Sequence, residues 1–246
     1  MTLHHLKAII LAGGIGTRMR PLTYLMPKSM LPIGGKPLLE RTITWLKGYG
    51  IRDVVFCVAY LRNQIIDYFG DGSKFDVTIE YAEADMPLGT AGQLKTAEKY
   101  ISDTFFAMNG DIVTTINLEK LVDFHKVRKG AGTIALKKFE VKIPYGHITV
   151  DSDSSIRSFQ EKPVLSLLAN AGTYILEPEI FDYIPSDRVV SLETETFSEL
   201  ITSGKRLNSY YEDAYWADVG TLTDFERVDK ELLSEYFSTL SAPQAK

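Results

Sequence analysis

The sequence has little cysteine and no long apolar run. Its one cysteine, Cys57, lies in the apolar segment 54–59, so we expect a buried thiol, and no disulfide can form within the chain. No apolar stretch reaches the about 20 residues that a membrane-spanning helix needs. The first residues lead directly into an expected strand, which leaves no room for a signal peptide. These absences predict a cytoplasmic protein that neither spans nor enters a membrane.

The sequence also lacks an excess of positive charge. The formal net charge is −5, and the densest basic runs, 126–129 and 137–138, are typical of solvated surfaces. A nucleic-acid-binding protein usually presents a basic face, so we expect no nucleic-acid partner. An acidic protein that binds an anionic substrate must instead gather its cations locally.

Such a local gathering occurs in the glycine-rich segment 7–37. It opens with the apolar run 8–12, which is typical of a buried parallel strand. Glycines follow at once, where we expect backbone amides to converge on an anion: Gly13, Gly14 and Gly16. Two cations, Arg18 and Lys28, lie on the same segment. Amides, a guanidinium and an ammonium together predict a polyphosphate site.

Neither of the two best-known phosphate-binding loops is present. Met19 stands where a dinucleotide-binding loop needs its third glycine, which disfavours an NAD-dependent redox enzyme. Gly35 and Lys36 are followed by Pro37, which excludes a P-loop. The whole string, GGxGTRxxPLTxxxPKxMLPIGGKP, resembles the signature of the sugar-1-phosphate nucleotidylyltransferases. The resemblance covers nearly the whole chain, and the hexapeptide repeats that some members add are absent.

Apolar runs alternate with helical patterns in the first half of the chain. We expect strands at 8–12, 53–60, 77–81 and 104–108, and helices at 37–47, 62–69 and 90–100. This order predicts an α/β fold with a doubly wound, mainly parallel mixed sheet, and the resemblance implies a Rossmann-like nucleotidyltransferase fold. Ligands of such sheets bind beyond the carboxyl ends of the strands.

The second half is more mixed. We expect helices at 118–129, 178–183, 192–203 and 223–236, and strands at 132–139, 146–150, 156–160, 169–176 and 207–211. The last helix should dock onto the sheet through an apolar stripe. We expect one catalytic domain over 1–240, with a nucleotide-binding half at about 1–112 and a sugar-binding half at about 113–240. Residues 241–246 should form a disordered tail.

The resemblance implies a reaction between an NTP and a sugar-1-phosphate that yields an NDP-sugar and pyrophosphate. The nucleophile is a phosphate oxygen that is already ionised, so no general base is needed, and the four histidines are scattered. Catalysis then depends on alignment and on neutralisation of charge. The implied catalytic residues are Arg18, Lys28 and Asp111, and Mg²⁺ would be held by Asp111 and Asp218.

The resemblance also implies the residues that bind the nucleotide. They are Leu11, Ala12, Gly13, Gly14, Gly16, Thr17, Arg18, Glu83, Pro87, Gly89, Thr90 and Gly110. Glu83 offers a carboxylate that suits the N1–H and N2 amino group of guanine. The segment 191–197 is similar to an S-x-E-x-x-x-F stretch of mannose-1-phosphate guanylyltransferases. GTP is therefore the expected nucleotide, with mannose-1-phosphate or a related hexose- or heptose-1-phosphate.

On the sugar side the resemblance implies contacts to hydroxyl groups and to the sugar phosphate. The residues concerned are Gly146, Glu161, Lys162, Asn170 and Gly172. A glucose-1-phosphate thymidylyl- or uridylyltransferase stays open as an alternative, as does a non-catalytic regulatory subunit that binds a nucleotide sugar. The sequence leaves open the base, the sugar, any feedback site and the oligomeric state, including a homo-oligomer.

Overall fold

A computed structural model of the chain describes residues 3–186 and 188–241, with side chains as far as residue 233. Its centre is a seven-stranded sheet with the order β12-β8-β11-β6-β1-β4-β5. The strands are β1 (Lys7–Leu11), β4 (Asp53–Val58), β5 (Thr78–Glu83), β6 (Phe105–Asn109), β8 (Gly132–Lys142), β11 (Val164–Leu176) and β12 (Leu207–Tyr211). Only β11 runs antiparallel to its neighbours in this sheet, so the prediction of a mainly parallel mixed sheet is confirmed.

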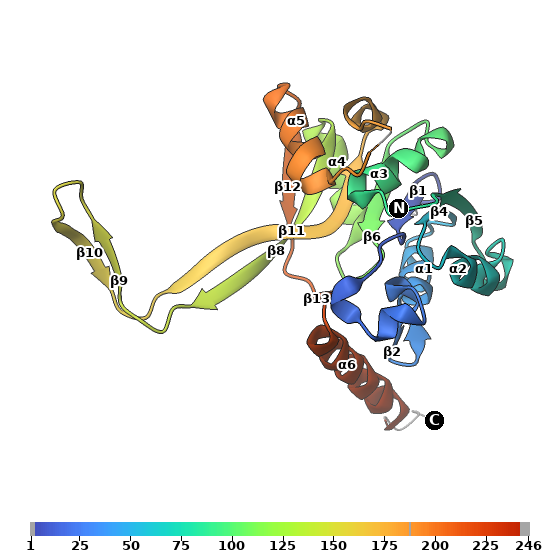
Figure 1. Cartoon of the computed structure of the whole chain (residues 1–246), viewed down its shortest axis with the longest axis horizontal. Coiled ribbons are helices and arrows are strands. Elements are labelled where there is room, and N and C mark those ends of the chain that lie inside the picture. The colour runs from blue at the N-terminus through green and yellow to red at the C-terminus, as the bar shows by residue number, and fades with distance from the viewer. Residues whose placement is uncertain (1–2, 187, 242–246) are drawn as a thin grey trace.

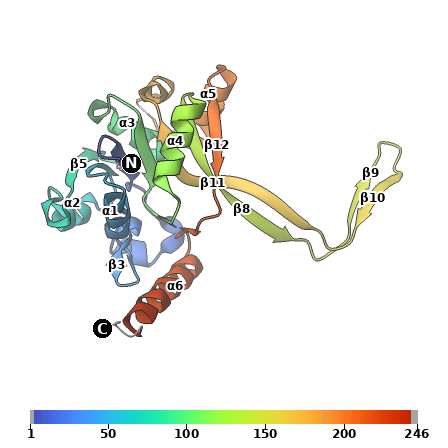
Figure 2. The ribbon, with the colours of Figure 1, turned by 180° about the vertical axis from the view of Figure 1, so that it is seen from behind.

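Helices cover both faces of the sheet (Figures 1 and 2). One core cluster joins the sheet to α1 (Leu38–Gly48), α2 (Arg62–Phe69) and α4 (Leu118–Arg128). The other joins it to α3 (Gly89–Thr96), α5 (Phe197–Thr202) and the 3₁₀ turn Pro178–Tyr183. Successive residues of a strand point to opposite faces, so Phe56 packs in the first cluster and Cys57 in the second. Burial raises the pKa of the Cys57 thiol to about 12, as expected of an inert core cysteine.

Three predicted helices differ in length or type. The helix expected over 90–100 ends at Thr96 and is followed by the 3₁₀ turn Glu98–Tyr100. The helix expected over 178–183 is a 3₁₀ turn, and that expected over 192–203 begins as the π turn Leu192–Thr196 before α5. The amides of Glu195 and Thr196 both bond to the Ser191 carbonyl, which widens this turn.

The final helix, α6 (Leu222–Ser241), does not dock onto the main sheet, so that prediction is wrong. It packs on a third apolar cluster formed by the glycine-rich segment and β13 (Trp216–Asp218). The members of this cluster are Met19, Leu31, Ile33, Leu38, Ala217, Val219 and Val228. The glycine-rich segment folds into a lobe with a core of its own. Within it, α6 packs against a small antiparallel ribbon formed by β2 (Pro32–Ile33) and β3 (Lys36–Pro37). Phe237 and the expected disordered tail beyond Ser241 lie outside the described side chains and residues.

No helix within the described ranges has both the length and the apolar character of a membrane span.

Strands β8 and β11 continue well past the sheet as a two-stranded ribbon. The expected strands stop at 139 and restart at 169, but the ladder runs on to the pair Lys142 and Val164. Beyond it β9 (His147–Val150) and β10 (Ile156–Gln160) form an outer hairpin. We name residues 138–168 the arm, and it projects away from the body in both views (Figures 1 and 2).

Substitution of two isoleucines on the same side of the sheet tests which residues form the core. Ile180 has no exposed surface, whereas Ile201 of α5 is 61% exposed. We expect Ile180→Ala to lower the free energy of unfolding by about 2–5 kcal/mol, because it removes buried carbon and leaves a cavity. The matched change Ile201→Ala should shift it by no more than about 0.5 kcal/mol. Urea unfolding followed by circular dichroism measures both, and equal losses would contradict the assigned core.

Candidate active site

The glycine loop starts where β1 ends. The Ala12 amide donates to the Cys57 carbonyl at 2.9 Å, which continues the ladder for one residue past β1. The Gly13 amide donates to Oε1 of Gln93 at 2.7 Å, in a buried contact with α3. A Cβ on Gly13 would lie 3.0 Å from that oxygen, so glycine is needed for close packing. The expectation that three glycine amides converge on an anion is therefore wrong for Gly13.

Of the other two glycines of the loop, only Gly14 borders open space, because a Cβ on Gly16 would lie 3.0 Å from Cγ2 of Thr23. A Cβ on Gly14 would meet no atom within 4 Å. Gly16 has a φ of +67°, a conformation that favours glycine, and it starts the 3₁₀ turn that presents Arg18. Thr23 fixes the turn by donating its hydroxyl to the Gly16 carbonyl at 2.8 Å.

A cavity of about 260 Å³ opens in front of this loop. It is lined by Leu11, Ala12, Gly14, Gly16, Thr17, Arg18, Lys28, Ser29, Gly110, Asp111 and Gly220. Seven of the residues expected to bind the nucleotide and all three expected catalytic residues are thus brought together. The sequence reasoning missed Ser29 and Gly220. The Ser29 hydroxyl is buried and has no hydrogen-bond partner among the described residues.

Two acidic residues from distant parts of the chain meet at the edge of this cavity. Asp111 follows β6, and Asp218 ends β13, which pairs antiparallel with β7 (Ile112–Thr114). This pairing places Asp218 opposite Ile112, and the Val219 amide donates to the Asp111 carbonyl at 3.0 Å. The carboxylates are therefore held side by side by backbone hydrogen bonds.

The Lys28 ammonium lies against both carboxylates. It donates to Oδ2 of Asp111 in an ion pair, and its Nζ is 3.8 Å from Oδ1 of Asp218. Its side chain is 13% exposed, so the charge is largely removed from solvent. Arg18 is a second cation of this site, because its charge also acts on the Asp218 carboxyl and its side chain lines the same cavity.

Asp218 has an oxygen left for a further ligand. Burial, with help from the neighbouring Asp111 charge, raises the pKa of the Asp218 carboxyl above its ordinary value. Its Oδ1 is buried and accepts no hydrogen bond from the described residues. No group of three or more metal-binding side chains occurs in the described part of the chain. Two carboxylates with substrate and water oxygens are the ligands that Mg²⁺ commonly takes in proteins, so the residues fit that ion.

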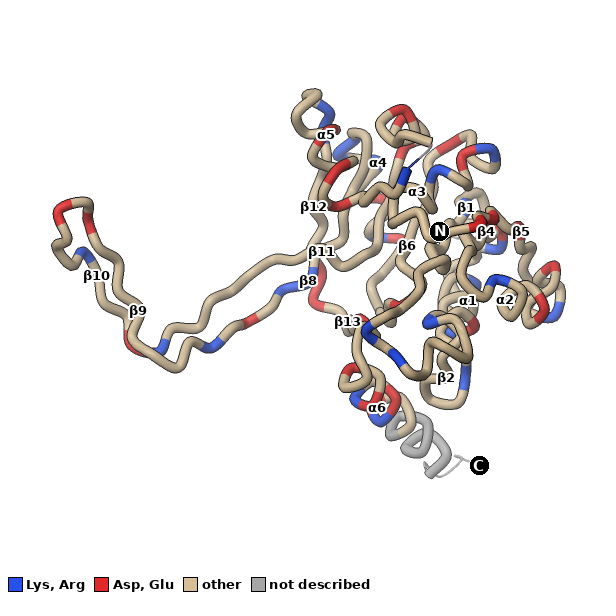
Figure 3. Tube along the Cα trace, viewed as in Figure 1, with Lys and Arg blue, Asp and Glu red and all other residues tan. Residues whose placement is uncertain are grey.

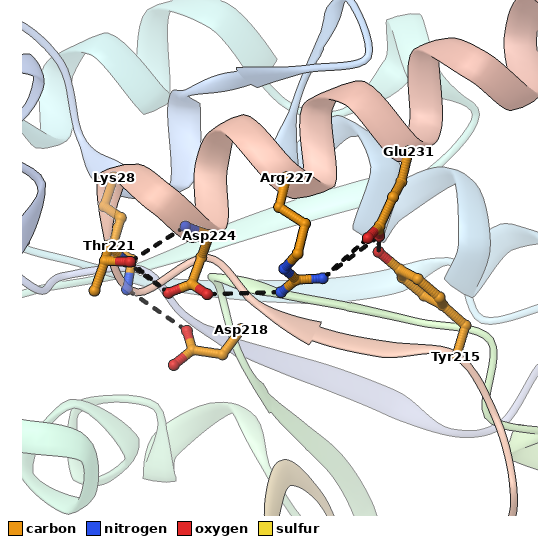
Figure 4. A network of polar contacts seen from close by, with 7 residues as sticks. All are labelled: Lys28, Tyr215, Asp218, Thr221, Asp224, Arg227 and Glu231. Carbon is orange, nitrogen blue, oxygen red and sulfur yellow. Dashed lines mark hydrogen bonds and ion pairs between the residues drawn. The ribbon is translucent and has the colours of Figure 1, made fainter.

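The start of α6 follows Asp218 closely in the chain and carries a network of polar contacts (Figure 4). Thr221 and Asp224 cap each other: the Thr221 amide donates to Oδ2 of Asp224 at 3.1 Å, and the Asp224 amide donates to the Thr221 hydroxyl at 3.2 Å. Arg227 links Asp224 to Glu231, which accepts from the Tyr215 hydroxyl at 2.6 Å. Tyr215 immediately precedes β13, so the network closes on the strand that delivers Asp218.

A second cavity of about 320 Å³ shares Arg18 and Asp111 with the first. It is lined by Arg18, Asn109, Asp111, Ile112, Asn170, Gly172, Glu193, Trp216 and Asp218. Two of the residues expected on the sugar side, Asn170 and Gly172, therefore lie here. Gly172 has a φ of +64°, and a Cβ on it would be 2.8 Å from the Asn109 amide nitrogen. The Trp216 indole donates to the Ala171 carbonyl at 2.8 Å and fixes this wall.

Glu193 is the main residue that the sequence reasoning missed, although it is the glutamate of the S-x-E-x-x-x-F stretch. It accepts from the hydroxyls of Thr90 at 2.7 Å and Ser191 at 2.9 Å. The Tyr174 hydroxyl donates to it at 3.3 Å and accepts from the Asn170 amide at 2.8 Å. Burial raises the pKa of Tyr174, which keeps this hydroxyl protonated as a donor. Glu193 thus joins Thr90 to the wall of the second cavity.

The residues expected near the base do not line the first cavity. Glu83 ends β5, and its carboxylate is 3.1 Å from Nε of Arg62. Gly89 has a φ of +74°, and a Cβ there would be 2.4 Å from the Val190 carbonyl oxygen, so the loop needs glycine. Pro87 precedes this contact, and Thr90 is held by Glu193.

The remaining residues expected on the sugar side are on the arm and line neither cavity: Gly146, Glu161 and Lys162. They lie together, because the Glu161 carboxylate would be 3.1 Å from a Cβ on Gly146. Lys162 has a φ of +44°, which is uncommon for a residue with a side chain.

The histidines have structural surroundings or lie on the surface. His125 is buried, with Thr133 Oγ1 2.8 Å from Nδ1 and Glu177 Oε1 3.0 Å from Nε2, and His4 contacts the Gly50 carbonyl at 2.9 Å. None of the four lines either cavity. The cavities therefore provide charge and alignment and hold no imidazole base.

Comparisons with known proteins agree on one family. The family model described as nucleotidyl transferase matches residues 7–235. A UTP–glucose-1-phosphate uridylyltransferase of Synechocystis is 34% identical over 97% of this chain. A mannose-1-phosphate guanylyltransferase of Mycobacterium tuberculosis is 35% identical over 95% of this chain, and the chain spans 66% of the length of each of these two relatives. HddC from Yersinia pseudotuberculosis, in a crystal structure complexed with GMP-PN, superposes with a TM-score of 0.73 at 27% identity, covering 92% of this chain and 99% of that one.

The raised pKa of Asp218 gives a prediction about stability. A carboxyl whose pKa is higher in the folded than in the unfolded state favours folding only while it is protonated, so its charge opposes folding at pH 7. We expect Asp218→Asn to raise the melting temperature at pH 7, and the gain should shrink as the pH falls below the folded pKa.

Thermal unfolding by circular dichroism at several pH values measures this gain. Asp67→Asn, on the exposed face of α2, is the control and should leave the melting temperature nearly unchanged. A lower melting temperature for Asp218→Asn at pH 7 would show that the Lys28 ammonium outweighs the burial.

Proposed function

The chain belongs to the nucleotidyl transferase family, among the sugar-1-phosphate nucleotidylyltransferases, and we propose that it transfers a nucleotidyl group from an NTP to a sugar-1-phosphate, with release of pyrophosphate. The observation that carries this proposal is the position of Lys28 between Asp111 and Asp218, at the boundary of two adjoining cavities. The first cavity is lined by the backbone of the glycine loop, and the second by side chains with amide, indole and carboxylate groups. Two anionic substrates can therefore meet at one charged centre.

The chemistry needs alignment of two anions. An ionised oxygen of the sugar phosphate attacks the α-phosphorus of the nucleotide, and the bond from that phosphorus to the bridging oxygen of the β-phosphate breaks. The electron pair leaves with pyrophosphate, so no proton has to be removed from the nucleophile. Arg18 lines both cavities and holds the β- and γ-phosphates. The Lys28 ammonium neutralises the charge that develops on the α-phosphate.

Asp111 and Asp218 would hold a magnesium ion. When bound, Mg²⁺ would neutralise phosphate charge and help to orient the α-phosphate. Asp218 offers a buried oxygen that accepts no hydrogen bond from the described residues, and Asp111 offers the carboxylate that Lys28 now contacts. Lys28 is then free to turn from Asp111 toward the phosphate.

GTP is the nucleotide that we propose, with mannose-1-phosphate or a related hexose- or heptose-1-phosphate as acceptor. The Mycobacterium guanylyltransferase and the GMP-PN complex of HddC support guanine. Glu83 and the segment 191–197 support it too. Two observations favour a uridylyl- or thymidylyltransferase instead. Arg62 binds one Glu83 oxygen, which leaves a single carboxylate oxygen as acceptor for the edge of a base. The Synechocystis uridylyltransferase is 34% identical to this chain.

A grid of five nucleoside triphosphates against several sugar-1-phosphates tests the proposal. Pyrophosphate is measured in each well, with and without MgCl₂, and after addition of EDTA. We expect magnesium-dependent release with GTP and mannose-1-phosphate. Absence of release in every well would overturn the proposed function, while release with UTP or dTTP alone would support the second candidate.

Loss of the charge of either Lys28 or Asp111 should slow turnover strongly. We expect Lys28→Ala and Asp111→Asn each to lower kcat on the order of 10²–10³-fold, because a group that stabilises the transition state is lost. Lys36→Ala is the matched control, since Lys36 is an exposed cation of the same segment that pairs with Glu40. Pyrophosphate release measures the rates, and thermal melting checks the fold. Rates near wild type in either variant would contradict the assigned roles.

The base preference is expected to depend on Glu83. Glu83→Gln replaces a carboxylate with an amide, which matches the mixed donor and acceptor edge of thymine or uracil better than that of guanine. We expect the ratio of kcat/KM for GTP to that for dTTP to fall by about tenfold, the effect of one altered hydrogen bond of about 1.4 kcal/mol. Asp85→Asn removes the other acidic partner of Arg62 and should leave the ratio unchanged. An unchanged ratio in Glu83→Gln would mean that other residues read the base.

A further inference from the structure

The arm is a ribbon without a partner in its own chain. Every hydrogen bond and ion pair that its residues make within the described chain stays inside the arm. Its contact with the body is at the root, where the Phe139 ring lies edge-on to Trp216 with centroids 5.8 Å apart. A two-stranded ribbon is marginally stable by itself in water, so the arm needs something to cover it.

The arm also gathers exposed apolar side chains. Of the twenty exposed large hydrophobic residues in the described chain, eleven lie in the arm. They are Phe139, Val141, Tyr145, Ile148, Val150, Ile156, Phe159, Val164, Leu165, Leu167 and Leu168. Uncharged residues make up most of the ribbon (Figure 3). Such a concentration on one projecting segment marks an interaction surface.

The direction of the arm is set by the sheet. The ladder between β8 and β11 continues without a break from the pair Leu136 and Asn170 to the pair Lys142 and Val164. To bend back over its own cavities, the arm would have to break several of these hydrogen bonds. No residue of the arm lines the second cavity of the same chain.

The second cavity and one part of the arm carry opposite charge. The second cavity is lined by three carboxylates, Asp111, Glu193 and Asp218, and by one cation, Arg18. The arm as a whole carries as many carboxylates as cations, but where the ladder of β8 and β11 ends it carries two cations, Lys142 and Lys162, and one carboxylate, Glu161. A sugar phosphate bound among those cavity carboxylates needs further positive charge, and the arm has it.

We propose that two copies of the chain exchange arms, so that the arm of each copy lies over the second cavity of the other. Lys162 and Glu161 of one copy then complete the sugar-phosphate site of its partner, while the apolar side chains of the arm are buried against the partner's surface. The arrangement is a symmetric exchange in which both arms make the same contact. The inference rests on the proposed function, because the completed site is the one that binds the sugar phosphate.

Heterodimers separate exchange from folding within one chain. Two chains with different affinity tags are co-expressed, one with Asp111→Asn and the other with Lys162→Ala, and the doubly tagged species is purified. With exchanged arms, one of its two sites has an intact body and an intact arm, so we expect about half of the wild-type rate. Each parent alone should be nearly inactive with GTP and mannose-1-phosphate. A heterodimer no more active than its parents would overturn the proposal.

The reciprocal heterodimer is the matched control. It pairs a wild-type chain with a chain that carries both substitutions. Exchanged arms leave neither site intact, and we expect a rate near that of the two singly substituted proteins, whereas arms that act within their own chain would give about half of the wild-type rate. That second result would also overturn the proposal.

The oligomeric state gives a readout that needs no turnover. We expect the wild type to sediment as a dimer, and a variant with residues 143–163 replaced by an Asn-Gly turn to sediment as a monomer with a folded body. A monomeric wild-type protein would overturn the exchange of arms. An inactive but dimeric wild type would instead contradict the proposed function, and the shortened variant would still decide whether the arm joins the copies.

Discussion

The contact of one ammonium with two carboxylates is the interaction on which the site depends. Lys28, Asp111 and Asp218 come from three distant parts of the chain, and their charges do not cancel. Charges of this kind are held together in a partly buried place only if the backbone around them is rigid. Much of the architecture around the cavities serves that end: the β7–β13 pairing, the capped start of α6 and the apolar lobe under the glycine loop all fix the three side chains.

The three glycines of the loop each have a different structural role. Gly13 allows the loop to pack on Gln93, Gly16 turns the chain, and Gly14 leaves the cavity open. A phosphate loop is often described as a ring of amides, but here one amide is used to tie the loop to α3. A ligand in the first cavity would therefore meet fewer backbone amides than the glycine count suggests, and the cavity wall adds the Arg18 side chain.

The alternation of apolar runs was sufficient to predict the sheet, the helices on both faces and the position of Asp111 beyond a strand. It could not predict the place of α6, because an apolar stripe shows that a helix packs but not on what. Nor could it predict the length of β8 and β11, because the outer parts of both strands are exposed on both faces and show no alternation of buried and exposed residues. Glu193 was within a stretch already singled out, yet its role as the junction between Thr90 and the second cavity depends on contacts across 103 residues. Such pairings have no local signal.

Strand β11 is both the wall of the second cavity and one side of the arm. Asn170 and Gly172 face the cavity, and the same strand runs outward to Val164 without leaving its ladder with β8. At about 3.3 Å per residue the ribbon works as a lever whose fulcrum is the irregular register between Asn170 and Tyr174. A small rotation of the ribbon at that point would move the outer hairpin over a much larger distance. A partner that binds the outer hairpin would therefore be able to shift the residues of β11 that line the second cavity.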